Sequence, residues 1–371
     1  MVVSRPPMGW NSWNTFGPEI DEQTVRSMAD VMVSEGYLAA GYEYLVIDDC
    51  WALRERDANG RMVPNPEKFP SGMKAVADYV HSKGLKFGIY SCVGNYTCAG
   101  FPGSYEYEFI DAETFAEWGV DFLKLDYCYK PLSEPGARLY RRMALALDNC
   151  GRDILLSACS WGADETHKWI KTTGSSMWRS TGDVVDSWAS VKNLYEIQRG
   201  IYEYNGALCF NDMDMLIVGM NGKGNVGVAG CTLEEYRTHF SIWSFFGSPL
   251  MMGSDIREAD DDVKAILQNP AVIAVDQDPA FRQPYTVHGN PHVWARHMAD
   301  GDIVLGIFNV DDNPMWVFVP FSELGIGRIA GRGFQMTDLW TGEDLGVKKE
   351  QFTLSVAPHA SKLFRLKLAR L

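Results

Sequence analysis

The chain has 371 residues, of which 46% are hydrophobic, 12% aromatic and 22% charged, and its formal net charge is -14. This composition supports a buried core and excludes a disordered chain, while the length allows two domains. The acidic balance, without any run of Lys or Arg, argues against nucleic acid and anionic membranes as partners. The 12 Trp and 16 Tyr residues suit a neutral partner such as a sugar.

No stretch of about 20 apolar residues is present, so no membrane span is predicted. The segment before Met8 is too short and too polar for a signal peptide, so we expect a cytoplasmic protein unless a leader has been removed. The eight cysteines form neither a CxxC pair nor a Cys/His cluster, so the sequence predicts no metal site and no cofactor. These cysteines are Cys50, Cys92, Cys98, Cys128, Cys150, Cys159, Cys209 and Cys231.

Short apolar runs that end in polar residues alternate with helical patterns over the first two thirds of the chain. The eight expected strands are Gly9–Ser12, Tyr44–Asp48, Lys86–Ser91, Phe122–Asp126, Ile154–Cys159, Met177–Thr181, Ala207–Asn211 and Pro249–Gly253. Eight strands in about 240 residues predict a (β/α)8 TIM barrel, which we place over residues 1–283. An open doubly wound sheet is the alternative, but GWNSWNTFG is not the Gly-rich phosphate loop such folds carry after the first strand.

The helical segments between these strands carry recognisable start and stop signals. Asp21 precedes an apolar stripe that runs from Val25 to Val33, and Thr232 with Glu235 predicts a capping box. After about residue 281 the pattern changes to short alternating runs punctuated by Gly, Pro and Asn. We therefore expect an antiparallel β-sandwich domain over residues 284–371.

The expected strands nearly all end in polar or aromatic side chains, and the carboxyl ends of barrel strands form the reactive face of the fold. Because side chains alternate along a strand, Lys124 and Asp126 share one face, while Leu123 and Leu125 face the other way. Any single Asp at a strand end could simply cap the next helix. A ligand or a catalytic function better explains why so many acidic and aromatic residues would gather at the carboxyl ends of the barrel strands.

Two carboxylates across an aromatic-lined pocket point to cleavage of a glycosidic bond. Asp126 is the expected nucleophile, with a pKa lowered by Lys124 and Tyr90. Asp183 is the expected acid/base, with a pKa raised by burial beside other acids, although Arg179 would oppose that rise.

Seven motifs in order resemble those of glycoside hydrolase family 27, which contains α-galactosidases and α-N-acetylgalactosaminidases. They are MGWNSWNTF, VIDDCW, GIYSCVGNYTCAGFPGSY, WGVDFLKLDYC, SACSWGA, MWRSTGDVVDSW and NDMDMLIVG. The resemblance implies that Asp126 is the nucleophile, that Asp183 is the acid/base and that Asp48 and Asp49 grip the 4- and 6-hydroxyls of galactose. It also implies that Trp13 is the aromatic residue that stacks on the sugar.

Further residues are assigned by the same resemblance. Tyr90, Lys124, Arg179 and Asp214 match other pocket positions. Cys98 lies beside the active site and corresponds to a family cysteine that is disulfide-bonded to the one matching Cys128. In a reducing cytoplasm we expect at most a strained or partial bond there.

The segment CSWGAD bears on which sugar is accepted. Family α-galactosidases usually carry Glu after the Cys and a bulky residue three positions later, where this chain has Ser160 and Ala163. These small residues resemble the α-N-acetylgalactosaminidases, so we expect removal of terminal α-linked N-acetylgalactosamine, with α-galactose as the alternative. A β-L-arabinopyranosidase is less favoured because its enzymes tend to lose one acid of the Asp48-Asp49 pair.

Two hypotheses from other classes complete the set. A non-catalytic sugar-binding barrel would be expected to lack Asp126 or Asp183, and both are present. A metal-dependent hydrolase could use Asp48, Asp49 and the pair Asp212 and Asp214, but no His falls at an expected strand end. The expected partner is thus a small molecule or oligosaccharide with a terminal α-galactose-type sugar, and a homo-oligomer remains open.

Overall fold

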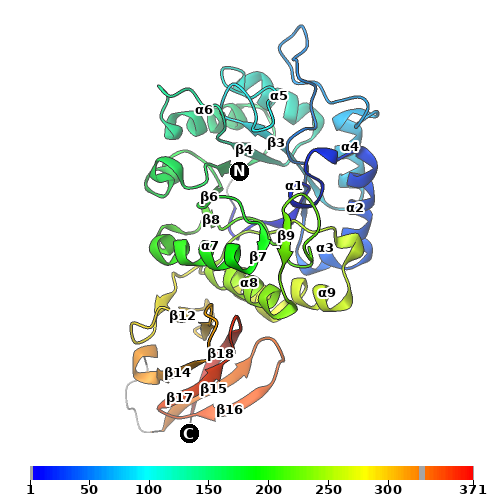
Figure 1. The fold of residues 1–371 in the computed structure, drawn as a ribbon. Helices are drawn as coiled ribbons and strands as arrows, with labels where there is room; N and C mark the ends of the chain where they lie inside the picture. Colours follow the sequence, from blue (N-terminus) through cyan, green and yellow to red (C-terminus); the bar gives the residue numbers. More distant parts are fainter. Residues whose placement is uncertain (1–2, 326–330, 371) are drawn as a thin grey trace.

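Eight parallel strands form one curled sheet in the order β10-β1-β2-β3-β4-β5-β6-β8 (Figure 1). The computed structural model describes residues 3–325 and 331–370. The strands are β1 (Met8–Asn11), β2 (Tyr44–Val46), β3 (Lys86–Cys92), β4 (Phe122–Asp126), β5 (Leu155–Cys159), β6 (Met177–Arg179), β8 (Phe210–Asp212) and β10 (Leu250–Met252). Leu216, just after β8, closes the ring, since its N–H donates to Met251 O at 2.7 Å and its carbonyl accepts from Gly253 N at 2.9 Å. The predicted (β/α)8 barrel is confirmed.

Helices surround this sheet on the outside (Figure 1). The longer ones are α2 (Glu22–Ser34), α4 (Gly72–Ser82), α5 (Glu108–Trp118), α6 (Gly136–Asn149), α7 (Trp188–Ile201) and α8 (Leu233–Phe246). Asp21 caps α2 by accepting from Thr24 N at 2.7 Å, and the capping box of Thr232 and Glu235 begins α8 as predicted. The apolar stripe of α2 is narrower than expected, because Val33 at its end is 41% exposed.

The seventh barrel strand begins later than predicted, at Phe210 instead of Ala207. Asn205 organises the preceding turn, since its side-chain oxygen accepts from the backbone N–H groups of Gly206 (2.8 Å) and Asn211 (2.7 Å). Leu208 has φ +77°, a left-handed conformation that a strand cannot contain. The shift makes Asp212 the last residue of the strand.

The C-terminal segment folds as an antiparallel domain below the barrel in Figure 1. One sheet has the order β11-β12-β13-β18-β15-β16, and β14 pairs with β17 in a second sheet. These strands are β11 (Tyr285–Thr286), β12 (Val293–His297), β13 (Ile303–Phe308), β14 (Met315–Pro320), β15 (Arg332–Asp338), β16 (Asp344–Lys348), β17 (Gln351–Val356) and β18 (Ser361–Arg370). The predicted β-sandwich domain is confirmed, and it joins the barrel along α8, where His359 Nδ1 contacts Glu235 Oε1 at 2.7 Å.

Two glycines provide a matched test of the barrel packing. A Cβ at Gly9 in β1 would lie 2.4 Å from the carbonyl oxygen of Tyr44 in β2, whereas a Cβ at Gly200 in α7 would meet nothing within 4 Å. We expect Gly9→Ala to lower the melting temperature markedly, because the backbone of β2 must move. Gly200→Ala should stabilise the protein by about 0.5 kcal/mol, since Ala is the better helix former. Thermal unfolding of both variants checks this, and equal effects would contradict the described strand contact.

Candidate active site

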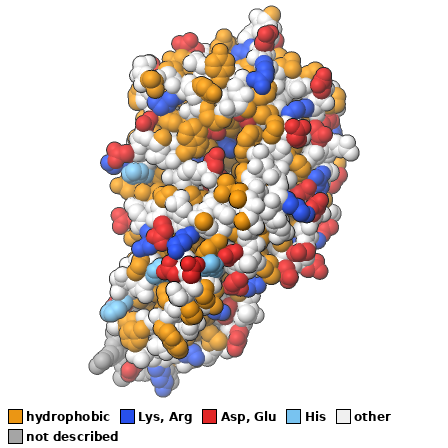
Figure 2. Space-filling model, viewed as in Figure 1, with side chains coloured by type: hydrophobic (Ala, Val, Ile, Leu, Met, Phe, Trp, Pro, Cys, Tyr) orange, Lys and Arg blue, Asp and Glu red, His pale blue; other side chains and the backbone are white. Residues whose placement is uncertain are grey.

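A cavity opens where the barrel strands end, and its volume is about 480 Å³ when the solvent at its mouth is included. In Figure 2 the hollow at the centre of the barrel shows charged side chains framed by hydrophobic ones. Its walls are formed by Trp13, Asn14, Asp48, Asp49, Tyr90, Cys98, Lys124, Asp126, Trp161, Arg179, Asp183, Asp214, Met215 and Val226. The structure therefore brings together all the predicted site residues except Ser160 and Ala163.

Asp126 is the last residue of β4 and is only 6% exposed. Its Oδ2 accepts from the Tyr90 hydroxyl at 2.9 Å, and its Oδ1 accepts from the backbone N–H of Tyr127 at 2.8 Å. Burial raises the pKa of Asp126 to about 6, although Lys124 and these two hydrogen bonds act in the opposite direction. The predicted lowering of this pKa is wrong, because desolvation outweighs the neighbouring cation.

Lys124 lies two residues before Asp126 on the same face of β4 and pairs with Asp48 rather than with Asp126. Its Nζ is 2.7 Å from Asp48 Oδ2, which also accepts from Asn11 Nδ2 at 2.8 Å. Asp49 is held separately, because its oxygens accept from the backbone N–H groups of Cys50 at 2.7 Å and Ala99 at 3.0 Å. Burial raises the pKa of Asp49.

Arg179 ends β6 and forms the second cationic centre, with a side chain only 4% exposed. It contacts Asp183 Oδ1 at 2.9 Å and Asp214 Oδ1 at 2.9 Å, and it donates to the carbonyls of Thr181 and Gly182 at 3.2 and 3.0 Å. Burial acts to raise the pKa of Asp183, but Arg179 and Lys124 together outweigh it and lower that pKa. The predicted rise at Asp183 is therefore also wrong, and the physical reason is these two cations together with a side chain that stays 66% exposed.

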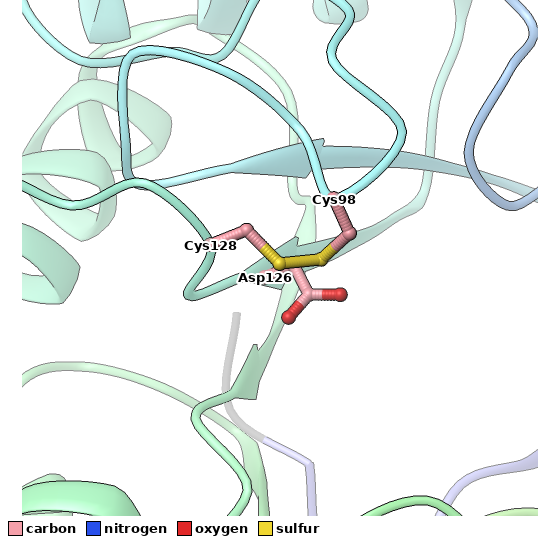
Figure 3. A group of neighbouring side chains, drawn as sticks. All are labelled: Cys98, Asp126 and Cys128. Atoms are coloured by element: carbon pink, nitrogen blue, oxygen red, sulfur yellow. A yellow bond between two sulfur atoms is a disulfide. The ribbon is translucent and has the colours of Figure 1, made fainter.

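A disulfide joins Cys98 to Cys128 beside Asp126 (Figure 3), where at most a partial bond was expected. Cys98 lies on the loop after β3 and Cys128 follows β4, so the bond ties together the two loops that wall the Asp126 side of the cavity. The Tyr90 hydroxyl contacts Cys98 Sγ at 3.5 Å. Asp126 and the two sulfurs lie close enough together to suggest a metal site, but disulfide sulfurs offer no thiolate ligand.

Two of the four acids proposed for a metal-dependent hydrolase are engaged with cations of the protein itself. Asp48 is paired with Lys124 and Asp214 with Arg179, both at short range. A cation would have to compete with these buried ammonium and guanidinium groups for the same oxygens. This arrangement does not favour the metal-dependent alternative.

Neither Ser160 nor Ala163 is among the residues that line the cavity. Ser160 is fully buried, and its hydroxyl lies 2.6 Å from the hydroxyl of Thr166. The neighbouring Trp161, with φ +56°, contributes to the wall instead. The predicted site residues did not include Asn14, Met215, Val226 or Trp161, although Trp161 stands in the same CSWGA motif at the end of the fifth predicted strand.

Comparisons with known proteins agree with this geometry. A family model described as alpha galactosidase A matches residues 5–278, and one described as the alpha galactosidase C-terminal beta sandwich domain matches residues 288–366. The chain is 43% identical over 364 residues to an α-galactosidase of Cyamopsis tetragonoloba, covering 97% of this chain and 86% of that protein. It is 40% identical over 389 residues to alpha-galactosidase A of Cellvibrio japonicus, with 98% and 92% covered.

A solved structure gives the same result in three dimensions. Alpha-galactosidase I from Mortierella vinacea superimposes with a TM-score of 0.91 at 33% sequence identity, covering 98% of this chain and 97% of that one. No helix of the described residues is long and apolar enough to cross a membrane. The chain belongs to the α-galactosidase family, glycoside hydrolase family 27, and is a glycosidase.

Proposed function

We propose that this glycosidase is a retaining exo-α-galactosidase in which Asp126 is the nucleophile and Asp183 the acid/base. The observation that carries the proposal is that these two carboxylates reach one cavity in contrasting surroundings, Asp126 from the end of β4 and Asp183 from the loop after β6, with β5 between the two strands. Asp126 is buried and fixed by two hydrogen bonds, whereas Asp183 is exposed at the mouth. A nucleophile needs a fixed position, and a proton carrier needs access to the leaving group and to water.

The chemistry proceeds in two displacements. Asp126 attacks the anomeric carbon while the bond to the aglycone oxygen breaks, and Asp183 gives its proton to that oxygen. In the second displacement Asp183 takes a proton from water, whose oxygen attacks the same carbon and releases Asp126. Each displacement inverts the configuration at the anomeric carbon, so the two together retain it.

The remaining wall residues suit a galactose-type ring. Trp13 supplies a flat apolar surface, and Asp48 and Asp49 supply acceptors for the 4- and 6-hydroxyls. Both acids of this pair line the cavity, which supports a sugar with a hydroxymethyl group over an arabinopyranoside. Lys124 pairs with Asp48 at 2.7 Å and so fixes the position of this acceptor.

We infer that plain α-galactose is preferred over its 2-acetamido analogue, contrary to the expectation from Ser160 and Ala163. The hydroxyl of Ser160 is engaged with Thr166, and neither small residue is among those that line the cavity. The large indole of Trp161 lines the wall there instead. The relatives of highest identity reported above are α-galactosidases by name, which supports the same choice.

Replacement of the nucleophile should separate activity from stability. Asp126→Asn should abolish turnover and yet be more stable at pH 7.5, by up to about 3 kcal/mol, because an ionised carboxyl with a pKa of about 6 is unfavourable in this buried site. The cost of ionisation is absent below about pH 4, grows as the pH rises toward 6 and is complete above it. The melting-temperature difference between variant and native protein should therefore vanish near pH 4.

Azide rescue identifies the nucleophile directly. In Asp126→Gly, azide should occupy the vacated position, attack the anomeric carbon and yield a β-linked galactosyl azide, detectable by NMR. Asp183→Gly is the matched control, since its azide product should be α-linked. A β-azide from the Asp183 variant would reverse the assignment.

The order of the two pKa values predicts opposite pH profiles for two substrates. Cleavage of a galactosyl disaccharide needs ionised Asp126 together with protonated Asp183. The fraction of enzyme molecules in this protonation state falls about tenfold per pH unit above pH 6. Its kcat/KM should fall above pH 6. A 2,4-dinitrophenyl α-galactoside needs no proton donor, so its kcat/KM should rise through pH 6 and then stay level. A disaccharide profile that also rises through pH 6 to a plateau would contradict the proposed protonation states.

Sugar preference is measured with two matched aryl glycosides. We expect kcat/KM for p-nitrophenyl α-galactoside to exceed that for the 2-acetamido counterpart by about tenfold or more, because a steric clash rejects a substrate firmly. The β-L-arabinopyranoside serves as the third arm. A preference for the 2-acetamido substrate would restore the interpretation based on Ser160 and Ala163.

A further inference from the structure

Asp214 lies at the cavity wall, but both of its carboxylate oxygens are already used by the protein. Oδ1 is 2.9 Å from Arg179, and Oδ2 accepts from the backbone N–H of Val184 at 2.7 Å. Val184 directly follows Asp183. The two oxygens of Asp214 thus contact Arg179, which also binds Asp183, and Val184, which follows Asp183. Because the Asp214 side chain is only 3% exposed, little of its surface is left for a sugar.

The backbone of Asp214 is held in a strained state that aims the carboxylate at these partners. Its φ is +83°, a left-handed conformation that non-glycine residues adopt at a cost. The conformation is fixed from both sides: Asp214 N donates to Asp212 Oδ1 at 2.9 Å, and Asp214 O accepts from Trp243 Nε1 at 2.7 Å. Strain secured by such surroundings is typical of functional sites.

The guanidinium of Arg179 contacts both Asp183 and Asp214, so the negative charge of Asp214 partly offsets the positive charge that acts on Asp183. Without the Asp214 carboxylate, Asp183 would hold its proton less tightly. We propose that Asp214 is a positioning residue: it divides the charge of Arg179, fixes the backbone beside Asp183 and so keeps Asp183 able to donate a proton. This inference rests on the proposed acid/base role of Asp183.

Other titratable groups surround this arrangement. They are Lys124 and Asp126 on β4, Asp48 after β2, Asp212 on β8 and Cys159 on β5, whose thiol stays uncharged because burial raises its pKa. Burial raises the pKa of Asp212 to about 6, and it lowers the pKa of His239, on α8 beside Trp243, to about 3. His239 is thus uncharged when the enzyme works, and Asp214 is the carboxylate that shares the guanidinium with Asp183.

The test is Asp214→Asn, which removes the charge but keeps the size, and Asn tolerates the left-handed backbone well. Losing the carboxylate that shares Arg179 should lower the pKa of Asp183, so fewer molecules carry the proton. We expect kcat/KM for a galactosyl disaccharide to fall about tenfold and that for the 2,4-dinitrophenyl galactoside to change by less than about threefold. Asp214→Glu, which keeps the charge, should return the ratio of the two toward the native value.

Asp186→Asn is the matched control, because Asp186 is a buried carboxylate that accepts from Gly222 N and the Tyr236 hydroxyl. Any loss there should affect both substrates in parallel. Parallel losses in Asp214→Asn, or no loss, would overturn the inference. Failure of the proposed function would show differently, as an Asp183→Ala variant that keeps full turnover of the disaccharide.

Discussion

Two buried cations, Lys124 on β4 and Arg179 on β6, make the acidic mouth of this barrel stable. Lys124 neutralises Asp48, and Arg179 is shared by Asp183 and Asp214. Two like charges about 4 Å apart in such surroundings repel by about 4 kcal/mol, so carboxylates would not gather here without these partners. Every other feature of the site is arranged around the two ion-paired centres.

The register of the parallel sheet places these groups at matching heights. Tyr90 pairs with Lys124 across β3 and β4, and Cys92 pairs with Asp126 one step further toward the mouth. Because side chains alternate, Lys124 and Asp126 point to the barrel interior in successive layers, with the cation below the carboxylate. The ammonium can therefore pair with Asp48 on β2's loop and leave the oxygens of Asp126 to Tyr90 and the backbone.

The features that follow from local pattern were predictable from the sequence. Alternation along a strand identified Lys124 and Asp126 as facing the barrel, and helix signals such as the Thr232 capping box located α8. The pKa order of Asp126 and Asp183 was predicted the wrong way round, since it depends on how burial competes with a shared guanidinium. The absence of Ser160 from the cavity lining was missed as well, because it depends on left-handed backbone at Trp161, a bulky residue that rarely adopts it, although Gly162 next to it favours that conformation.

The pKa order has a consequence for the two halves of the proposed reaction. In the free enzyme, Arg179 stabilises ionised Asp183, which is the state that a general base needs for hydrolysis of the glycosyl-enzyme. Once Asp126 is esterified its charge is gone, so the site loses a negative charge and Asp183 ionises more readily still. Glycosyl transfer to Asp126, by contrast, starts from the less populated protonated form of Asp183. These charges therefore favour the second displacement. The first displacement needs protonated Asp183, and in the proposed arrangement the charge of Asp214 preserves that form by offsetting the effect of Arg179.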